Sequence, residues 1–431
     1  MIQQTITKTL ITDFNHNNTI IMLNTIKWIQ TFLLIAAFYG AIGQTKISAD
    51  QAKSIIKSSN IKLKGDALQV AYSKAIVHTA SVLSPTQFNG EFGQFNSAFF
   101  DIGVGINQSF ALPKVYRTKL AVNQQNVKTA QVYAALSEKE IMQQLDILFQ
   151  NFALLSAKEK LLSYQDSLFN IFVQKNVLRW QNGESDILAK ASAEQQKASI
   201  NRQLDWVKSL KQSLLVDLNG LLSSDQLYVP DELLFGLIPL PLTYQGIINL
   251  QHPSLLIVEN EMQAARLNTQ LQKAAKLPTL SVGYKNVSFR GLGPDNVYYN
   301  SSDRFSSFQL GVAAPIFGKS YNAAIEAARV QEDFSSNQYL LKKIELDNQI
   351  RQKSILRQEL VSKYESFQKE SIPNAKLVKQ VSSKQFESGE INYLDYVLLN
   401  NQAIGIEMEL LDLIAAANVL TIELQYLTNN L

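Results

Sequence analysis

The chain has 431 residues, 46% of them hydrophobic, and its 40 basic and 37 acidic side chains leave a formal net charge of +3. This near balance, without a basic run, argues against a nucleic-acid-binding protein, which carries a basic face or tail. The absence of cysteine excludes disulfides, thiolate metal sites and cysteine nucleophiles, and three scattered histidines exclude a histidine-rich metal site.

Residues 1–43 are typical of an N-terminal extension followed by an export signal. A short positive segment from Met22 to Lys27 precedes the apolar run "WIQTFLLIAAFYGAIG", whose last residues are small, as signal peptidase requires. A membrane anchor is the alternative, but about 15 apolar residues fall short of the ~20 that span a bilayer. We therefore expect an exported protein, with Met22 as an alternative start, and any membrane crossing must use strands.

The next part of the chain, 44–240, predicts a helix, two strands, a very long helix and a return helix. These are expected near 49–82, 86–96, 100–112, 116–181 and 186–221. In the second strand Ile102, Val104 and Ile106 alternate with small residues, which is the period of a strand with one apolar face. The long helix follows Pro113 and contains neither proline nor glycine before Gly183.

Apolar residues along this long helix recur at 4–3 spacing, the pattern of a coiled-coil seam. They are Ile141, Leu145, Leu148, Phe152, Leu155, Leu162, Phe169 and Val173. At 1.5 Å per residue, about 65 helical residues reach roughly 100 Å. Such a rod is far longer than the core of a globular domain requires.

Residues 241–431 repeat the same order of elements after a linker that carries three prolines, "YVPDELLFGLIPLPLTYQG". The corresponding helices and strands are expected near 247–276, 279–290, 305–317, 321–387 and 391–428. "INQSFALPKVY" pairs with "LGVAAPIFGKSY", and "LRWQNGESDIL" pairs with "KQFESGEINYL". Duplication at a period of roughly 200 residues indicates two tandem structural repeats. Pro373 is expected to kink the second long helix.

All four strands have one apolar face and one small or polar face, which fits either a sheet packed on a core or a lipid-facing barrel. Four strands cannot close a wide barrel, and lipid forbids open edges, so other chains would have to contribute. Aromatic residues of the strands and the outer loop suit a girdle at the lipid–water boundary: Phe88, Phe92, Phe99, Phe100, Tyr298, Tyr299 and Phe305. The loop 290–304 is the candidate for the extracellular side.

The order of these elements resembles the TolC-type outer-membrane efflux proteins over nearly the whole mature chain. The segments that carry the resemblance are "LPTLSVGY", "FQLGVAAPIFG", "ESGEINYLDYVLLNNQ" and "ANVLTIELQYLTN". The segment from Gln87 to Lys119 is most similar to the branch that serves heavy-metal pumps of the resistance–nodulation–division (RND) class. The resemblance implies a mainly α chain with a β-barrel portion. Three copies would form a 12-stranded outer-membrane barrel, continued by a long helical barrel across the periplasm.

What the resemblance implies about function is a passive exit duct of a tripartite efflux system. Its partners would be two further copies of itself, a periplasmic adaptor (membrane fusion) protein, an inner-membrane RND pump and outer-membrane lipid. No catalytic motif is visible, so neither enzymatic activity nor a cofactor is expected. Heavy-metal cations are the expected cargo. Drug efflux and type I protein secretion remain alternatives, as does a periplasmic coiled-coil structural protein without a pore.

Two Gly–Glu pairs mark the turns of the helical hairpins, Gly183-Glu184 and Gly389-Glu390. A glycine after a long helix supplies the left-handed residue that ends it, and the acid favours the start of the next helix, so a plain turn explains both pairs. The resemblance implies in addition that these tips dock onto the adaptor. It also makes Pro113 and Pro315 the points where a barrel strand becomes a helix of the tunnel wall.

The resemblance further places Asp395 at the position of an aspartate that constricts the periplasmic end of the tunnel. The family's partner arginine is Ile391 here and its second acid is Leu398, which weakens a salt-bridge latch. Either a ring of acidic groups or an apolar constriction follows. The candidate residues are Asp395, Tyr393, Tyr396, Leu398 and, near the first tip, Asp186. A solvated helix face is the alternative interpretation of Asp395.

Overall fold

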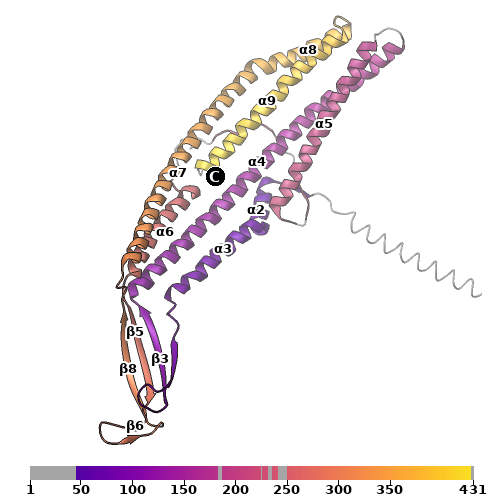
Figure 1. Ribbon diagram of the computed structural model, residues 1–431. Coiled ribbons are helices and arrows are strands. Elements are labelled where there is room, and N and C mark those ends of the chain that lie inside the picture. The colour runs from indigo at the N-terminus through magenta and orange to yellow at the C-terminus, as the bar shows by residue number, and fades with distance from the viewer. Residues whose placement is uncertain (1–44, 183–186, 225, 232–234, 241–249, 429–431) are drawn as a thin grey trace, which may run out of the picture.

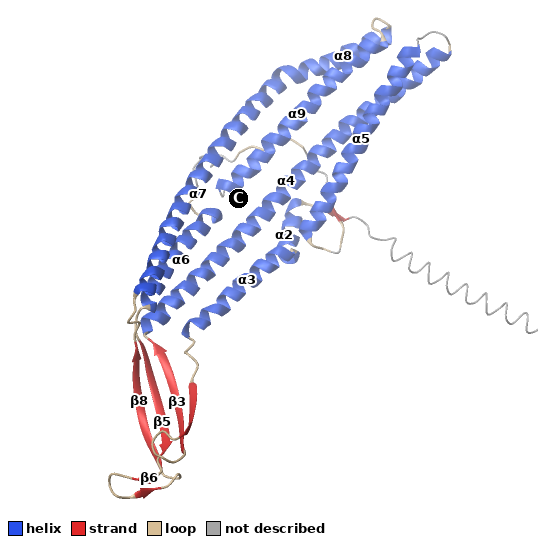
Figure 2. Cartoon of the chain, in the orientation of Figure 1, coloured by secondary structure: helices blue, strands red, loops and turns tan. Residues whose placement is uncertain are grey.

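The computed structural model describes residues 45–182, 187–224, 226–231, 235–240 and 250–428. They form an elongated, gently curved body in which a bundle of long helices continues directly from a small sheet (Figure 1). Figure 2 shows the strands of this sheet gathered at one end and the helices filling the remaining length. The expected export signal, 1–43, lies outside the described residues.

The described chain runs twice through helix, strands, long helix and return helix. The first pass contains β1 (Thr45–Ile47), α2 (Ala49–Ser59), α3 (Ile61–Val77), η1 (His78–Ser81), β2 (Gln87–Gly93), β3 (Asp101–Ala111), α4 (Pro113–Gln181), α5 (Ile187–Leu222) and β4 (Tyr228–Pro230). The second contains α6 (Pro253–Ala275), β5 (Thr279–Ser288), β6 (Gly291–Leu292), β7 (Tyr298–Tyr299), β8 (Arg304–Ala313), α7 (Lys319–Ser366), η2 (Phe367–Ser371), α8 (Ile372–Ser388) and α9 (Tyr393–Thr428). The division into repeats at 44–240 and 241–431 stays our proposal.

The principal sheet is antiparallel with the strand order β2-β3-β5-β8, so that the two passes meet between β3 and β5. One row of paired residues crosses all four strands as Phe88, Ile106, Tyr284 and Phe308. The rings of Tyr284 and Phe308 lie 5.5 Å apart. This face is uncovered in the single chain, since Phe308 is 84% exposed.

The opposite face of the sheet carries mainly Gly, Ser, Asn and Gln side chains. Lys285 and Glu91, which form an ion pair at 2.7 Å, lie on this face. The outer edges of β2 and β8 have no strand partner in the described chain. A sheet that forms part of a larger barrel needs one apolar and one polar face, and it needs unpaired edge strands that can bond to further strands. This sheet has both properties.

The coiled-coil seam predicted along α4 is confirmed. Seven of its residues are buried: Ile141, Leu145, Leu148, Phe152, Leu155, Leu162 and Phe169. All of them except Phe152 belong to two clusters. One lies in the middle of the helical body, where α2, α4, α5 and α9 meet, and the other lies between α4, α5 and α9 toward the tips. At 69 residues, α4 spans roughly 100 Å. Among the described helices, none is both long and apolar enough to cross a bilayer.

The helix expected over 49–82 is divided in two by Asn60. Its side-chain carbonyl accepts a hydrogen bond from the Leu63 amide at 3.1 Å and so caps α3, while its amide group donates to the Leu221 carbonyl at 2.7 Å. The tie to α5 redirects the chain, because an asparagine that bonds backbone groups competes with the helical ladder. A parallel pairing of β1 with β4 was not predicted, and α6 begins at Pro253 rather than near 247.

The expected irregularity at Pro373 takes the form of a π-helical turn, Phe367–Ser371, directly before it. Proline lacks the N–H that an α-helical carbonyl four residues earlier would accept, and a wider turn tolerates this loss. Figure 1 shows the helical rod changing direction between α7 and α8. The turn lets the second long helix bend over α9 without ending.

Candidate functional site

The strand-to-helix junctions lie where the sequence places them, but they differ in construction. Pro113 is the first residue of α4, where its missing N–H costs nothing, and β3 ends only two residues earlier. The Ala111 amide donates to the Tyr116 hydroxyl at 3.1 Å, which ties the end of the strand to the first turn of the helix. Pro315 instead lies in a five-residue link between β8 and α7.

The second hairpin tip is built around Gly389, which ends α8 in the left-handed conformation with φ 80°. The Glu390 amide donates to the Gln385 carbonyl at 2.8 Å, and the Ser388 hydroxyl lies 3.0 Å from the Glu390 carboxylate. A larger side chain at Gly389 would meet open space, so the requirement for glycine comes from the backbone alone. The first tip, with Gly183, Glu184 and Asp186, lies outside the described residues.

Asp395 and Leu398 share an exposed face in the first turns of α9. The Asp395 amide donates to the Asn392 side chain at 2.9 Å, so Asn392 caps this helix. The Asp395 carboxylate is exposed, and Leu398, one turn further, is 57% exposed. Both side chains are thus available to water or to a neighbouring chain. The end of α9 that adjoins α8 lies at the end of the body farthest from the sheet (Figure 1).

Tyr393 and Tyr396, by contrast, lie inside the chain. Their rings pack against Phe386 of α8, with centroid separations of 6.4 and 4.9 Å. Burial raises the pKa of the Tyr393 phenol and of the Tyr396 phenol above the usual value. These two tyrosines hold α8 on α9. Among the gate candidates that the structure describes, Asp395 and Leu398 are thus the exposed ones.

Polar links between the two helical hairpins were missed by sequence reasoning. Lys158 of α4 pairs with Asp412 of α9 at 2.6 Å. The Asn401 side chain accepts from two glutamines of the other hairpin, Gln165 at 3.2 Å and Gln196 at 3.1 Å. These partners are more than 200 residues apart, and each looks like an ordinary exposed residue in the sequence. They fix the position of α9 against α4 and α5 just below the tips.

A second polar cluster lies in the middle of the helical body. The Asp146 carboxylate pairs with Lys53 at 2.9 Å and accepts from the Tyr426 hydroxyl at 3.0 Å. Nearby, His252 caps α6, and burial, reinforced by the Lys139 charge, lowers its pKa to about 4. Burial also lowers the pKa of Lys139 to about 8. The cluster joins α2, α4, α6 and α9 and therefore stabilises the packing of these four helices.

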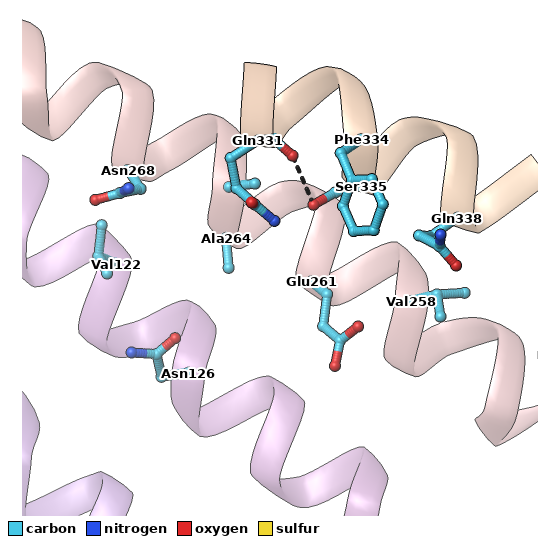
Figure 3. A pocket seen from close by; sticks show the side chains of 11 residues that line it. Val122, Asn126, Val258, Glu261, Ala264, Asn268, Gln331, Phe334, Ser335 and Gln338 are labelled. Atoms are coloured by element: carbon cyan, nitrogen blue, oxygen red, sulfur yellow. Dashed lines mark hydrogen bonds between the residues drawn. The ribbon is translucent and has the colours of Figure 1, made fainter. Parts of the chain in front are cut away.

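A shallow groove of about 420 Å³ lies between α4, α6 and α7, nearer the sheet (Figure 3). Figure 3 shows Glu261, Asn126 and Phe334 around it. The Glu261 carboxylate accepts from the Tyr133 hydroxyl at 2.8 Å, which raises the Tyr133 pKa. The rest of the groove lining consists of amide and aliphatic side chains and the Ser335 hydroxyl. Across the described ranges, no group of three or more His, Asp or Glu is placed to hold a metal ion.

Comparison with known proteins gives one relative in sequence and several in structure. No protein-family model matches this chain. The cation efflux system protein CusC of Escherichia coli O6:H1 is 25% identical over 406 residues, which cover 87% of this chain and 85% of CusC. A solved structure of CusC superposes with a TM-score of 0.74 at 19% identity, over 89% of this chain and 92% of that one.

Two further channels have the same fold at lower identity. The Campylobacter jejuni CmeC outer membrane channel gives a TM-score of 0.74 at 15% identity, over 88% of this chain and 85% of its own. The Vibrio cholerae outer membrane protein VceC gives 0.72 at 13%, over 88% and 95%. The fold class expected from the sequence, a mainly helical chain with four barrel-type strands at one end, is thereby confirmed for the single chain.

Proposed function

We propose that this chain, which belongs to the TolC-type family of outer-membrane efflux proteins, is the exit duct of a tripartite efflux system. It conducts cargo passively from an inner-membrane pump and a periplasmic adaptor to the cell exterior. The observation that carries the proposal is the continuity between a sheet with two unlike faces and helices of roughly 100 Å. The relatives that share this architecture are channels rather than enzymes.

The sheet fits the outer membrane only as part of a closed barrel. The apolar face, with Phe308 and Leu310 more than four-fifths exposed, needs lipid. The unpaired edges of β2 and β8 need strand partners, because a bilayer core offers no water to satisfy free backbone groups. Three copies would supply twelve strands, with β8 of one chain beside β2 of the next.

The helical part then forms the wall of a tunnel through the periplasm. The order of the helices around the wall follows the order of the strands. Each strand of the order β2-β3-β5-β8 is next in the chain to one helix, which gives the helix order α3-α4-α6-α7. The described ends of α4 and α8 lie at the far end of the body. We place adaptor docking at the tips that follow them, at Gly389 and Glu390 and at Gly183 and Glu184. Asp395 and Leu398 line the periplasmic gate, with Asp186 near the first tip.

Heavy-metal cations are our proposed cargo, supported by similarity to a cation efflux protein over most of the chain. The charged groups on the water-facing side of the described sheet are already bonded, since Lys285 pairs with Glu91 and the Asp101 carboxylate accepts from the amides of its own loop. This side therefore offers no tight cation site. This suits a conduit, because a channel that held its cargo tightly would delay its release. Energy and cargo choice come from the pump.

Electron microscopy of the purified detergent-solubilised protein, combined with planar-bilayer recording, tests the duct. We expect hollow particles of threefold symmetry, with a helical part roughly 100 Å long, and single-channel currents. A compact monomeric particle without current would overturn the proposal. A long trimer that gives no current, even with altered tips, would favour a structural coiled-coil protein.

Growth assays of a strain that lacks the gene test the cargo. We expect loss of tolerance to copper, silver or zinc salts, restored by the gene on a plasmid, with unchanged tolerance to dyes and detergents. Sensitivity to dyes and detergents alone would contradict a metal cargo and leave the duct itself in place.

A further inference from the structure

We call the apolar face of the sheet, with Phe308 and Leu310, the lipid-type face. At the end of the sheet farthest from the helices, aromatic rings lie on the opposite face. Phe305 pairs with Val287, and Val287 pairs with Gly103, in a row next to that of Lys285. Side chains alternate along a strand, so Phe305 shares the face of Lys285 and Ser307, whereas Phe308 lies on the other. The girdle expected from the sequence includes Phe305 and Tyr299, but Phe305 lies on the face opposite to Phe308, and the Tyr299 ring packs against Phe305.

Three rings form a cluster on this face. The centroids of Tyr299 and Phe305 lie 5.3 Å apart, and Phe289 lies 6.0 Å from the first and 6.2 Å from the second. All three pairs meet edge to face, the favoured geometry of packed aromatic rings. The Tyr299 hydroxyl donates to the Asp295 carboxylate at 2.6 Å, a bond within the β6–β7 hairpin that holds the Tyr299 side chain in place.

A fourth ring reaches the same face from the loop between β2 and β3. A methyl group at Gly103 would come within 3.3 Å of the Phe95 ring, so this glycine leaves room for the ring. The Lys285 ammonium lies 5.9 Å from the Phe95 centroid. The loop is held by Asp101, whose carboxylate accepts from the amides of Asn96 at 3.1 Å and Ser97 at 2.9 Å.

We propose that Phe95, Phe289, Tyr299 and Phe305 form an aromatic collar that narrows the exit of the duct. The inference rests on the proposed function, because only barrel closure turns this face toward the water-filled interior. Below the collar the face carries the Lys285–Glu91 pair and otherwise mainly glycine, serine and amide side chains, which leave a wide bore. Three copies would therefore bring twelve rings to one level, where both outer loops converge.

The energetics favour a specific role over chance placement. A barrel interior is ordinarily polar, and large apolar rings there lose contact with lipid without gaining a dry core. Phe305 is 42% exposed and Phe95 39% exposed in the single chain, so neither is buried by its own packing. Rings at a constriction exclude wide solutes and resist wetting, which a hydrophilic mouth does not. The collar would set the largest cargo that can leave.

Polymer exclusion in planar bilayers tests the collar. We expect Tyr299→Ser combined with Phe305→Ser to raise single-channel conductance about twofold and to admit larger polyethylene glycols. The control is Phe308→Ser, which removes a phenylalanine ring of the same strand from the lipid-type face. It should leave the polymer cut-off unchanged. Equal conductance and equal cut-off in the double variant and the wild type would overturn the collar.

The absence of cysteine allows a second measurement that removes no more than one ring. In open channels of Tyr299→Cys, a charged methanethiosulfonate reagent added to the water should alter the current, whereas Leu310→Cys, on the lipid-type face, should not react. Reaction at position 310 but not at position 299 would overturn the assignment of faces. If the wild type conducts but neither the serine variants nor modification of Tyr299→Cys changes the current, the collar alone is contradicted. If the wild type does not conduct, the duct and the collar are contradicted together.

Discussion

His252 and Asp395 show how surroundings decide what one residue can do. His252 is buried as the cap of α6, and its ring contacts the Ser254 hydroxyl at 2.7 Å. Lys139 and Lys342 both disfavour its charged form. Asp395, equally close to a helix start, keeps its carboxylate exposed. The first residue therefore affects stability, and the second is free to act on solutes or neighbouring chains.

His252 makes the fold acid-sensitive in a defined window. Its folded pKa of about 4 is below the unfolded value near 6.5, so the folded chain binds fewer protons, and stability is complete above pH 6.5 and lost toward pH 4. We expect His252→Asn, which retains a capping side chain, to flatten the fall of Tm in this window. The exposed His78→Asn should not change that fall. Identical Tm–pH curves for His252→Asn and the wild type would contradict the assignment.

Asp395→Ala tests the gate at the same scale. Three carboxylates around one opening attract cations and can bind donor groups of the neighbouring chains. Their removal should loosen the closed end, which raises basal conductance, and should reduce the preference for cations. Planar-bilayer recording with asymmetric potassium chloride measures both properties. Asp395→Glu keeps the charge and should retain the cation preference. Unchanged conductance and ion preference in Asp395→Ala would remove this residue from the gate.

At the scale of elements, helix ends do more than local propensity suggests. Asn60 both caps α3 and bonds the Leu221 carbonyl of α5, and it is buried. Ser48 caps α2 in a capping box with Gln51, but at an exposed position. The first cap therefore joins two helices of the wall, whereas the second stabilises only its own helix.

The two caps are predicted to differ in cost. Ser48→Ala should destabilise the fold by about 1 kcal/mol, as exposed N-caps do. Asn60→Ala also leaves a buried carbonyl without its donor, which adds roughly 1–3 kcal/mol. Thermal unfolding followed by circular dichroism should give a clearly larger fall in Tm for Asn60→Ala. An equal fall for both variants would show that the bond to α5 contributes nothing.

At the scale of the whole molecule, the sheet is shaped for two different surroundings. Adjacent residues on β8 illustrate this, since Leu310 belongs to the lipid-type face and Gln309 to the face of Lys285. The same alternation crosses all four strands, with β3 and β5 contributed by different halves of the chain. One register thus aligns an apolar band across the sheet.

Arginine substitutions at these neighbouring positions test the assignment of faces in the membrane. Leu310→Arg places a charge in the lipid band at a cost of roughly 2–4 kcal/mol and should reduce the amount of trimer in the outer-membrane fraction. Gln309→Arg places the same side chain in water and should leave that amount unchanged. The measurement is the trimer band of isolated membranes on semi-native gels. Equal loss in both variants would contradict lipid contact on one face only.

The sequence by itself determined the four strands of the principal sheet, the coiled-coil seam of α4 and the second hairpin tip. Each depends on a short-range property: the period of two in β3, the 4–3 spacing from Ile141, and the positive φ that Gly389 permits. Each of these properties depends on residues close together in the sequence, so it can be predicted without knowledge of distant contacts.

Only the tertiary structure decided which side chains face inward, outward or one another. Tyr393 and Tyr396 look like gate residues beside Asp395, yet both pack on Phe386. Tyr299 lies in the β6–β7 hairpin between β5 and β8, and the path of this hairpin, rather than alternation, turns its ring toward Phe305. The reason is physical: loop paths and contacts between residues hundreds of positions apart follow from packing of the whole chain, which local periodicity does not encode.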